Sequence, residues 1–285
     1  MIESKLYIDH NSCTRCGNCT QICGSKTLEI IENSLVQVNP TMCCSCGHCA
    51  AICNEDAISI DKDSRRAFSV KKYDENLSEI EKLLIGKRSV REYKNKDLEK
   101  SIIENMIHYA EKSPSSSNKR KREYLVVTDK TKIQELEKAV LQKFNSFRII
   151  LNPFVIGILK LVSKKLGHEL SVLLTHIRQM NTYFEQGKSP IFRNAPAIVC
   201  ITAPKGATQS VDDCIIAQQY MMLYAQSKGI ASCIIGYAQY AHTVMEKKLN
   251  LKKGKVIYAV SIFGFPKFVY KKEIEYLRKP EVTWW

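Results

Sequence analysis

The chain has 285 residues, 12 cysteines and a formal net charge of +14. This length allows one small module together with one large hydrophobic core. The longest apolar run, Ile149–Val162, is interrupted by Asn152, Pro153 and Lys160 and is too short to cross a bilayer, so we expect a cytoplasmic protein with no membrane partner.

Charge is distributed unevenly along the sequence. Residues 1–70 carry a formal charge of about −2, and residues 71–285 carry about +16. A basic body suits the binding of anions, such as the phosphate group of a cofactor. The densest basic segment is Lys119–Arg122, but no helix-turn-helix, zinc-finger or RNA-binding signature surrounds it. We therefore predict no nucleic-acid partner.

Taken in chain order, the first feature is a pair of cysteine motifs. The pattern C-x2-C-x2-C-x3-C runs from Cys13 to Cys23 and is repeated from Cys43 to Cys53. This spacing is typical of iron–sulfur modules, in which the fourth cysteine of each motif ligates the other cluster. We expect one [4Fe–4S] cluster to be ligated by Cys13, Cys16, Cys19 and Cys53, and a second by Cys43, Cys46, Cys49 and Cys23.

Other kinds of cysteine site fit this pattern less well. A zinc site usually combines two pairs of the form C-x2–4-C. A disulfide framework is typical of small secreted chains, and no secretory segment follows Met1. Cys44 lies inside the second motif and is predicted to be a packed side chain, because Cys43 preserves the spacing. Reduced thiols of this kind favour a cytoplasmic, anaerobic setting.

The two motifs belong to an internal repeat. Residues 9–31 and 39–60 repeat with a shift of thirty positions, and Gly17 and Gly47 occupy equivalent places where the backbone must turn tightly. Together these features resemble a bacterial 2[4Fe–4S] ferredoxin over residues 1–62.

The rest of the chain mixes helices and strands, which predicts an α+β fold. Residues 63–76 are polar and are predicted to be a linker, followed by a single domain over residues 77–285. Helices are predicted at 77–86, from a cap at Asp97, and at 211–228, and residues 133–192 are predicted to be helical throughout. Strands are predicted at 28–30, 57–60, 124–128, 197–202, 230–235 and 256–263.

Six short segments in this larger part resemble the FMN-dependent nitroreductase family. They are Lys87–Arg91, Ser113–Asn118, Arg193–Pro196, Gly229–Gly236, Gly264–Pro266 and Arg278–Pro280. Each segment alone is weak, but six in register behind a ferredoxin-like module resemble the ferredoxin-fused nitroreductases of anaerobic bacteria. The resemblance implies an α+β sandwich that binds FMN, with residues 133–192 as a helical lid insertion.

The resemblance also implies where FMN binds. A phosphate dianion suits guanidinium and ammonium groups, and the residues that the resemblance places at the phosphate are Lys87, Arg88, Ser89, Arg91 and Arg278. Those that it places at the flavin ring are Pro114, Ser115 and Ser116 from a partner subunit, Asn118, and the backbone of Ile235 and Gly236. The ordinary alternatives stay open: arginine is often a surface charge, and asparagine and glycine are common in turns.

These features predict an FMN-dependent oxidoreductase. Electrons would arrive through the two clusters, from a ferredoxin or from NAD(P)H, and would reduce a small acceptor such as a nitro compound, a quinone or an activated alkene. No catalytic side chain is expected, since the flavin N5 performs the chemistry. The family resemblance further implies a homodimer. The alternatives are an electron-transfer relay to a protein partner, and a reductive-dehalogenase-type or flavin-degrading reaction on the same fold.

Overall fold

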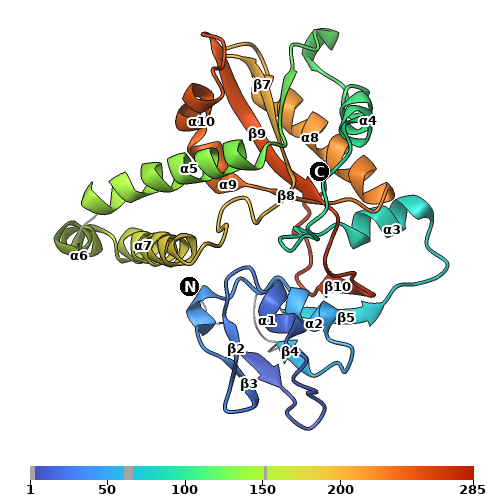
Figure 1. The fold of residues 1–285 in the computed structure, drawn as a ribbon. Helices are drawn as coiled ribbons and strands as arrows, with labels where there is room; N and C mark the ends of the chain where they lie inside the picture. Colours follow the sequence, from blue (N-terminus) through green and yellow to red (C-terminus); the bar gives the residue numbers. More distant parts are fainter. Residues whose placement is uncertain (1–3, 61–66, 151–152) are drawn as a thin grey trace. The chain divides into compact units, whose positions relative to one another are not determined.

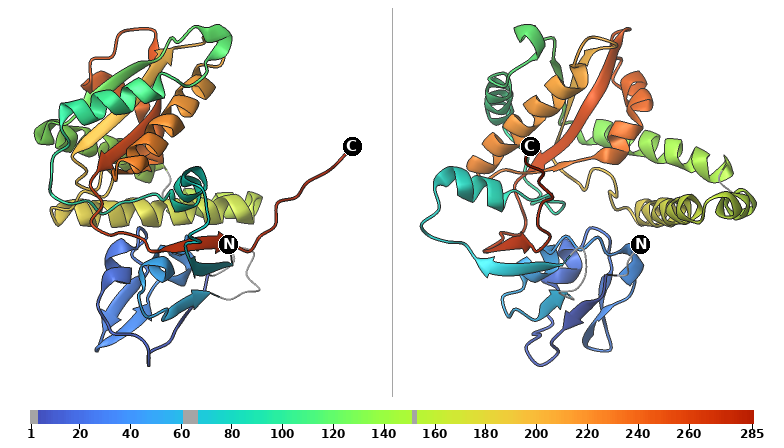
Figure 2. Two further views of the ribbon diagram at one scale, coloured as in Figure 1. Left: turned by 90° about the vertical axis from the view of Figure 1, so that its right-hand side faces the viewer. Right: turned by 180° about the vertical axis from the view of Figure 1, so that it is seen from behind.

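The chain passes through two structural units in the computed structural model, which describes residues 4–60, 67–150 and 153–285 (Figures 1 and 2). The first unit, here called the cysteine unit, comprises residues 1–87 and 267–285. The second, here called the sheet unit, comprises residues 88–266. The chain therefore leaves the cysteine unit and returns to it at its C-terminal end.

The N-terminal part of the cysteine unit consists of short elements around a small apolar core. Strands β1 (Leu6–Ile8) and β4 (Ile58–Ile60) pair antiparallel, as do β2 (Leu28–Ile31) and β3 (Ser34–Gln37). Helices α1 (Asn18–Ile22) and α2 (His48–Ile52) each start directly after a cysteine-motif glycine, and the short turn η1 (Pro40–Met42) precedes the second motif. Leu6, Ile22, Leu28, Leu35 and Ile58 form the centre of this core.

The remainder of the cysteine unit joins segments that are far apart in the sequence. Strand β5 (Phe68–Lys72) pairs antiparallel with β10 (Lys272–Tyr276). Helix α3 (Glu79–Gly86) follows β5 and begins with a capping box, in which Ser78 and Glu81 bind each other's backbone N–H groups. Phe68 and Ile274 are both buried in the core of this unit, so the pairing is held by apolar packing as well as by backbone hydrogen bonds.

This pairing corrects the predicted domain boundaries. Residues 63–66 of the predicted 63–76 linker lie outside the described residues, but β5 occupies residues 68–72 of the rest of the segment. Residues 267–285 belong to the cysteine unit and not to the predicted 77–285 domain. A polar composition suggested a linker, whereas two inward-facing residues, Phe68 and Ala67, are enough to anchor a short strand.

The sheet unit is built on a four-stranded antiparallel sheet with the order β6-β7-β9-β8. Its strands are β6 (Glu123–Val127), β7 (Ala197–Pro204), β8 (Ala231–Ile234) and β9 (Lys255–Gly264). Side chains on β7 alternate between two separate cores: Val199 and Ile201 lie in one, and Ile198 and Cys200 in the other. Both faces of the sheet are therefore covered.

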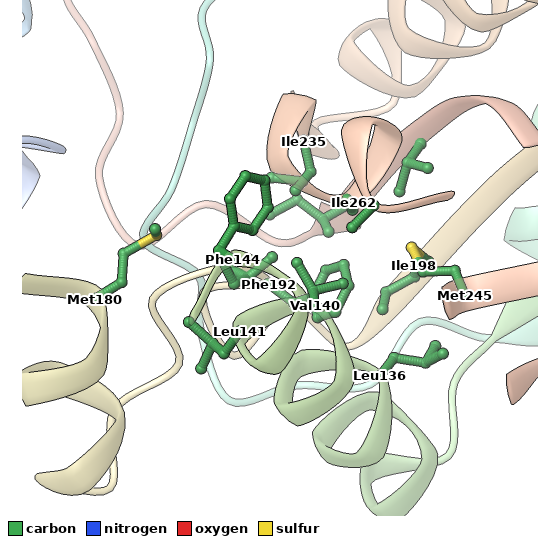
Figure 3. Close-up of a cluster of buried hydrophobic side chains, with 14 of the residues drawn as sticks. Leu136, Val140, Leu141, Phe144, Met180, Phe192, Ile198, Ile235, Met245 and Ile262 are labelled. Carbon is green, nitrogen blue, oxygen red and sulfur yellow. The ribbon is translucent and has the colours of Figure 1, made fainter. Parts of the chain in front are cut away.

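Helices form a layer on each face of this sheet (Figure 1). One face is covered by α4 (Lys100–Ala110) and α8 (Ser210–Ser227), and the other by α5 (Lys130–Ile150), α7 (Lys164–Glu185), α9 (Gly236–Tyr240) and α10 (His242–Lys248). Helix α6 (Pro153–Val162) connects α5 and α7. Figure 3 shows the second core, where Val140 and Phe144 of α5 gather with Phe192 and Ile198.

The predicted α+β class is confirmed, and most predicted elements are present within two residues of their expected ends. Two details are wrong. Helix α4 starts at Lys100 with Glu99 at its N-cap position, so Asp97 is not its cap. The helical insertion ends at Glu185, and the residues up to Phe192 form turns and extended backbone. No helix in the described part of the chain is long and apolar enough to cross a membrane.

Candidate cluster and cofactor sites

Four cysteine side chains from both motifs surround one hollow in the cysteine unit. This hollow, here called site I, is lined by Cys13, Cys16, Cys19 and Cys53, together with apolar side chains that include Leu35 and Ile58. The first three cysteines come from the first motif and Cys53 from the end of the second. The structure thus brings together the four residues that the crossover pattern groups on one cluster.

The other four motif cysteines, Cys43, Cys46, Cys49 and Cys23, are here called site II, and Cys49 lies near the thiols of the other three. The neighbouring thiols that act on Cys49 include Cys23 of the first motif and Cys43 of the second. Burial and these neighbours raise the pKa of Cys49, and the same causes raise the pKa of Cys19 at site I to about 11. Thiolates at both sites are therefore unfavourable unless a cation stabilises them, as cluster iron does.

The arrangement of thiols suits a bulky cluster better than a single ion. Among the described residues, no group of three or more His, Cys, Asp or Glu side chains is placed to hold one metal ion. The ligands of a [4Fe–4S] cluster stand around a cube of iron and sulfide and do not meet at one point. At site II, Thr27 supplies further support, since its backbone N–H donates to Cys23 Sγ at 3.3 Å.

The backbone of each motif requires the glycine that the repeat predicted. Gly17 and Gly47 have φ angles of +74° and +73°, in the left-handed region that only glycine enters without cost. Gly47 has a second constraint, because a Cβ atom there would lie 2.8 Å from Cγ2 of Ile274 on β10. Cys44 is exposed, so its prediction as a packed side chain is wrong.

In the sheet unit, the segment at Arg88 lies beside the end of β8. Ser89 forms a parallel bridge with Ser232, and Val90 N donates to the Ser232 carbonyl at 3.1 Å. The hydroxyl of Ser232 is buried and has no hydrogen-bond partner among the described residues. Two predicted segments, Arg88–Arg91 and Ile235–Gly236, are therefore held close to the same short strand.

The start of α9 leaves room for a ligand. A Cβ atom built on Gly236 would meet no heavy atom within 4 Å, so this glycine faces open space. Its neighbour Ile235 is fixed by a backbone hydrogen bond to Val260 at 3.0 Å. The first N–H groups of a helix have no partner within the helix and are available to an acceptor. This position is open, rigid and able to donate.

A second arginine that the sequence reasoning missed lies next to Arg91. Burial lowers the pKa of Arg193, and the neighbouring Arg91 lowers it further. Arg193 also interacts with Cys233 of β8, which places this cationic pair at the same strand as Ser89. Two cations close to each other repel, and the carboxylates of Glu92 and Glu137 offset part of that repulsion at Arg193. An anion bound between them would relieve that cost. The motif Arg193–Pro196 indicated the family, but no pattern in the sequence marked Arg193 as a ligand.

The predicted ring-binding loop, Pro114–Asn118, is anchored to other elements. Ser116 N donates to Asp213 Oδ1 on α8 at 2.9 Å. Arg122 donates through Nη1 to Ser113 Oγ at 2.6 Å and to the Pro114 carbonyl at 3.2 Å. The Arg122 side chain is 0% exposed and pairs with Glu111 at 3.4 Å. Arg122 is therefore a buried side chain that holds the loop in place, and it is not part of an exposed basic cluster.

Two predicted phosphate ligands lie in the other unit. Lys87 ends the first segment of the cysteine unit, and Arg278 lies in its second segment. The Arg278 side chain is 72% exposed and pairs with Glu281 at 3.6 Å. The structure thus groups Arg88, Ser89 and Arg91 with Ile235 and Gly236 in the sheet unit, but it does not place Lys87 and Arg278 in that unit.

Comparisons with known proteins agree with this division. Residues 84–265 match the nitroreductase family, and residues 5–54 match a 4Fe-4S dicluster domain. A search of curated proteins gave no match.

Solved structures share the fold of the sheet unit. A nitroreductase with bound FMN from Desulfitobacterium hafniense is 19% identical, with a TM-score of 0.53 over 73% of this chain and 98% of that chain. A nitroreductase with bound FMN from Bacteroides fragilis is 19% identical, with a TM-score of 0.51 over 67% of this chain and 89% of that chain. Iodotyrosine deiodinase bound to FMN and 3-iodo-L-tyrosine is 16% identical, with a TM-score of 0.52 over 72% of this chain and 98% of that chain.

The fold and the two cysteine sites together define an oxidoreductase that joins an iron–sulfur unit to a three-layer sheet unit. The chain belongs to the nitroreductase family, whose match covers more than half of its length. The predicted fusion of a ferredoxin-type module to a nitroreductase is confirmed.

Proposed function

We propose that the protein is an FMN-dependent reductase of small electron acceptors, served by two [4Fe–4S] clusters. The observation that carries this proposal is the group of residues around β8: Ser89 is bridged to Ser232, the buried hydroxyl of Ser232 has no hydrogen-bond partner among the described residues, and Gly236 faces open space. When bound, the clusters supply single electrons and FMN supplies a hydride from N5. The expected acceptors are nitro compounds, quinones and activated alkenes.

The residues of the sheet unit fit the phosphate and ring of FMN. Arg88, Arg91 and Arg193 offer guanidinium groups, which bind phosphate through paired hydrogen bonds. Ser89 and the unsatisfied hydroxyl of Ser232 add neutral donors. The open backbone at Gly236 is suited to an acceptor atom of the ring, because a larger side chain there would fill the space.

At the iron–sulfur sites, the chain contributes the cysteine ligands and apolar surroundings that exclude water. We propose that the site I and site II cysteines ligate one cluster each. Apolar side chains such as Leu35 and Ile58 line site I and exclude water from it. Solvent exposure and hydrogen bonds to sulfur both tune the potential of such clusters, so the Thr27 N–H bond to Cys23 would act on site II.

We further propose a homodimer formed through α4 and α8. Tyr109, Val211, Ile216 and Tyr220 are large apolar side chains that these helices leave exposed. Tyr109 stacks on Tyr224, with ring centroids 4.0 Å apart, and so joins the two helices into one surface. The loop Pro114–Asn118 is anchored to α8, so a partner on this surface would meet it. Tyr220→Glu should then give monomers by light scattering, whereas Tyr240→Glu, a more exposed control on α9, should leave the dimer intact.

The flavin proposal is tested by loading and by turnover. Anaerobically prepared protein should release FMN on denaturation, and Arg193→Ala should retain at least tenfold less FMN than Arg178→Ala, an exposed arginine on α7. Recovery of FAD alone, or equal retention in both variants, would contradict the proposed site.

Turnover separates the alternative functions. Reduced ferredoxin, NADH and NADPH are supplied as donors, with a nitroaromatic, a quinone, an activated alkene and a halogenated phenol as acceptors. Reduction of the first three supports the proposal. Release of halide would favour a dehalogenase, loss of intact FMN would favour flavin breakdown, and reduction only of a protein acceptor would favour a relay.

A further inference from the structure

The C-terminal end of the chain lies across the second cysteine motif within the cysteine unit. This segment, residues 270–276, is here called the C-terminal strap. Tyr270 Oη and His48 Nδ1 are hydrogen-bonded at 2.8 Å, and Tyr276 Oη donates to the Cys46 carbonyl at 3.4 Å. Between these contacts, Ile274 packs so closely on Gly47 that no Cβ atom could be added there without a shift. The strap therefore contacts the motif at several consecutive points.

Lys272 is the unusual residue of the strap. Its side chain is 11% exposed, and its Nζ donates to the Cys53 carbonyl at 2.5 Å and to Asp56 Oδ1. Lysine is almost never buried without a partner, because desolvation of the ammonium group is costly. Here the ammonium group is bound to the backbone of a site I cysteine.

The charges around Cys53 do not cancel. The carboxylate of Asp56 is 65% exposed, so water screens it, whereas the ammonium of Lys272 is largely shielded from water. Ala57 and Ile58, which follow Asp56 directly, line the hollow of site I. The net field that reaches site I from this pair is therefore positive.

A positive field has a definite effect on a cluster. Reduction adds one electron, and a nearby positive charge stabilises the more negative state. The same charge has less effect on a cluster farther away, since Coulomb energy falls with distance and with intervening solvent. The charged residue of the strap contacts Cys53 of site I, whereas the contact of the strap to Cys46 of site II is made by the neutral hydroxyl of Tyr276.

We propose that Lys272 raises the reduction potential of the cluster at site I, so that the C-terminal strap makes the two clusters unequal. This inference rests on the proposed cluster ligation and adds to it a potential-setting residue from the opposite end of the chain. A single electron delivered by a low-potential donor would then reside preferentially at site I. Lys272 is a positioning residue, since it acts on the cluster through Cys53 and through its field.

The test is a redox titration of the full-length protein with dithionite, followed by electron paramagnetic resonance so that the two couples are resolved. In Lys272→Met, one couple should fall by about 59 mV, which is a tenfold change in the one-electron equilibrium constant. In Asp56→Asn, the same couple should rise, because the screened carboxylate that opposes Lys272 is gone. Lys71→Met removes an equal charge from the exposed face of β5 and should shift neither couple.

A field effect should shift the reduction potential in opposite directions in Lys272→Met and Asp56→Asn. Simple loosening of the motif would shift the potential of both variants in the same direction. Lys272→Arg retains the charge and should restore the wild-type potential. An unchanged potential in Lys272→Met, or shifts of equal sign in Lys272→Met and Asp56→Asn, would overturn the proposal. If Lys272→Met takes up no iron, Asp56→Asn decides alone: a rise supports the proposal and no rise overturns it. Wild-type protein with fewer than two clusters would instead refute the ligation on which it rests.

Discussion

Substitution of Gly47 by alanine should destabilise the cysteine unit through two separable effects. A left-handed φ of +73° costs a residue with a Cβ atom about 1–2 kcal/mol. The added Cβ would also lie 2.8 Å from Ile274 Cγ2, and overpacking of this kind costs about 1–3 kcal/mol. Gly17 is the matched control, since its φ is +74° but the nearest atom to its added Cβ is 3.9 Å away. The loss in free energy of unfolding should therefore be larger for Gly47→Ala than for Gly17→Ala by about 1–3 kcal/mol.

The assay is anaerobic urea unfolding followed by the visible absorbance of the clusters at wavelengths longer than the flavin band, so that the signal reports on the cysteine unit. Ile274→Ala removes the clashing atom and should recover part of the loss, so that the double variant is less destabilised than the sum of the single ones. The coupling free energy should be at least about 1 kcal/mol, above the 0.3–0.5 kcal/mol scatter of additive pairs. Equal effects of Gly47→Ala and Gly17→Ala, or strict additivity with Ile274→Ala, would refute the contact between β10 and the second motif.

Three further predictions follow from single sites. Arg122→Ala should cost about 3 kcal/mol in thermal unfolding because it leaves Glu111 without its buried partner, whereas the exposed Lys121→Ala should stay within about 0.5 kcal/mol. Burial raises the pKa of Glu137 above 4.5, so its contribution to stability is present below pH 4.5 and is lost as the pH rises through the raised pKa. The melting temperature of the wild-type protein should therefore fall relative to that of Glu137→Gln over this pH range. A difference in melting temperature that stays constant with pH would contradict the pKa shift. Cys49→Ser should lower the iron content from about eight atoms per chain towards four, while Cys44→Ser should keep all of it, because Cys44 is exposed and only hydrogen-bonds the side chain of the ligand Cys46.

Features with a local cause could be predicted from the sequence. The cysteine spacing grouped the four thiols that line one hollow at site I, because a crossover arrangement depends on a short repeated pattern, and both left-handed glycines followed from the same repeat. The strands of the sheet were predictable because their apolar residues are continuous, as expected when both faces are covered. These predictions needed no knowledge of distant contacts.

Features that depend on distant contacts were missed. Strand β5 is paired with a segment about two hundred residues away, and its few apolar residues do not distinguish it from a polar linker. Arg122 was grouped with its exposed neighbours because adjacent basic residues suggest a surface, yet its partners are Glu111, the C-cap residue of α4, and Asp213 on α8. Arg193 stands next to Arg91 only after the fold forms. In each case the deciding neighbour is remote in the sequence.

The return of the chain to the cysteine unit changes how its two units can be separated. If an N-terminal module were followed by a reductase domain, as the predicted boundaries imply, one cut near residue 70 would free the reductase. That cut would leave β10 without the paired strand β5, with Ile274 exposed and Lys272 without Cys53. If such a fragment lost its flavin or failed to fold, the cause would be the C-terminal strap without its partner strand, and the result would say nothing about electron flow. Residues 88–266 form the compact unit that carries the sheet and both helical layers. The cysteine unit, by contrast, is built from two segments far apart in the sequence, and Ile274 of the second segment packs on Gly47 of the second cysteine motif, so a fragment that lacks either segment breaks this packing.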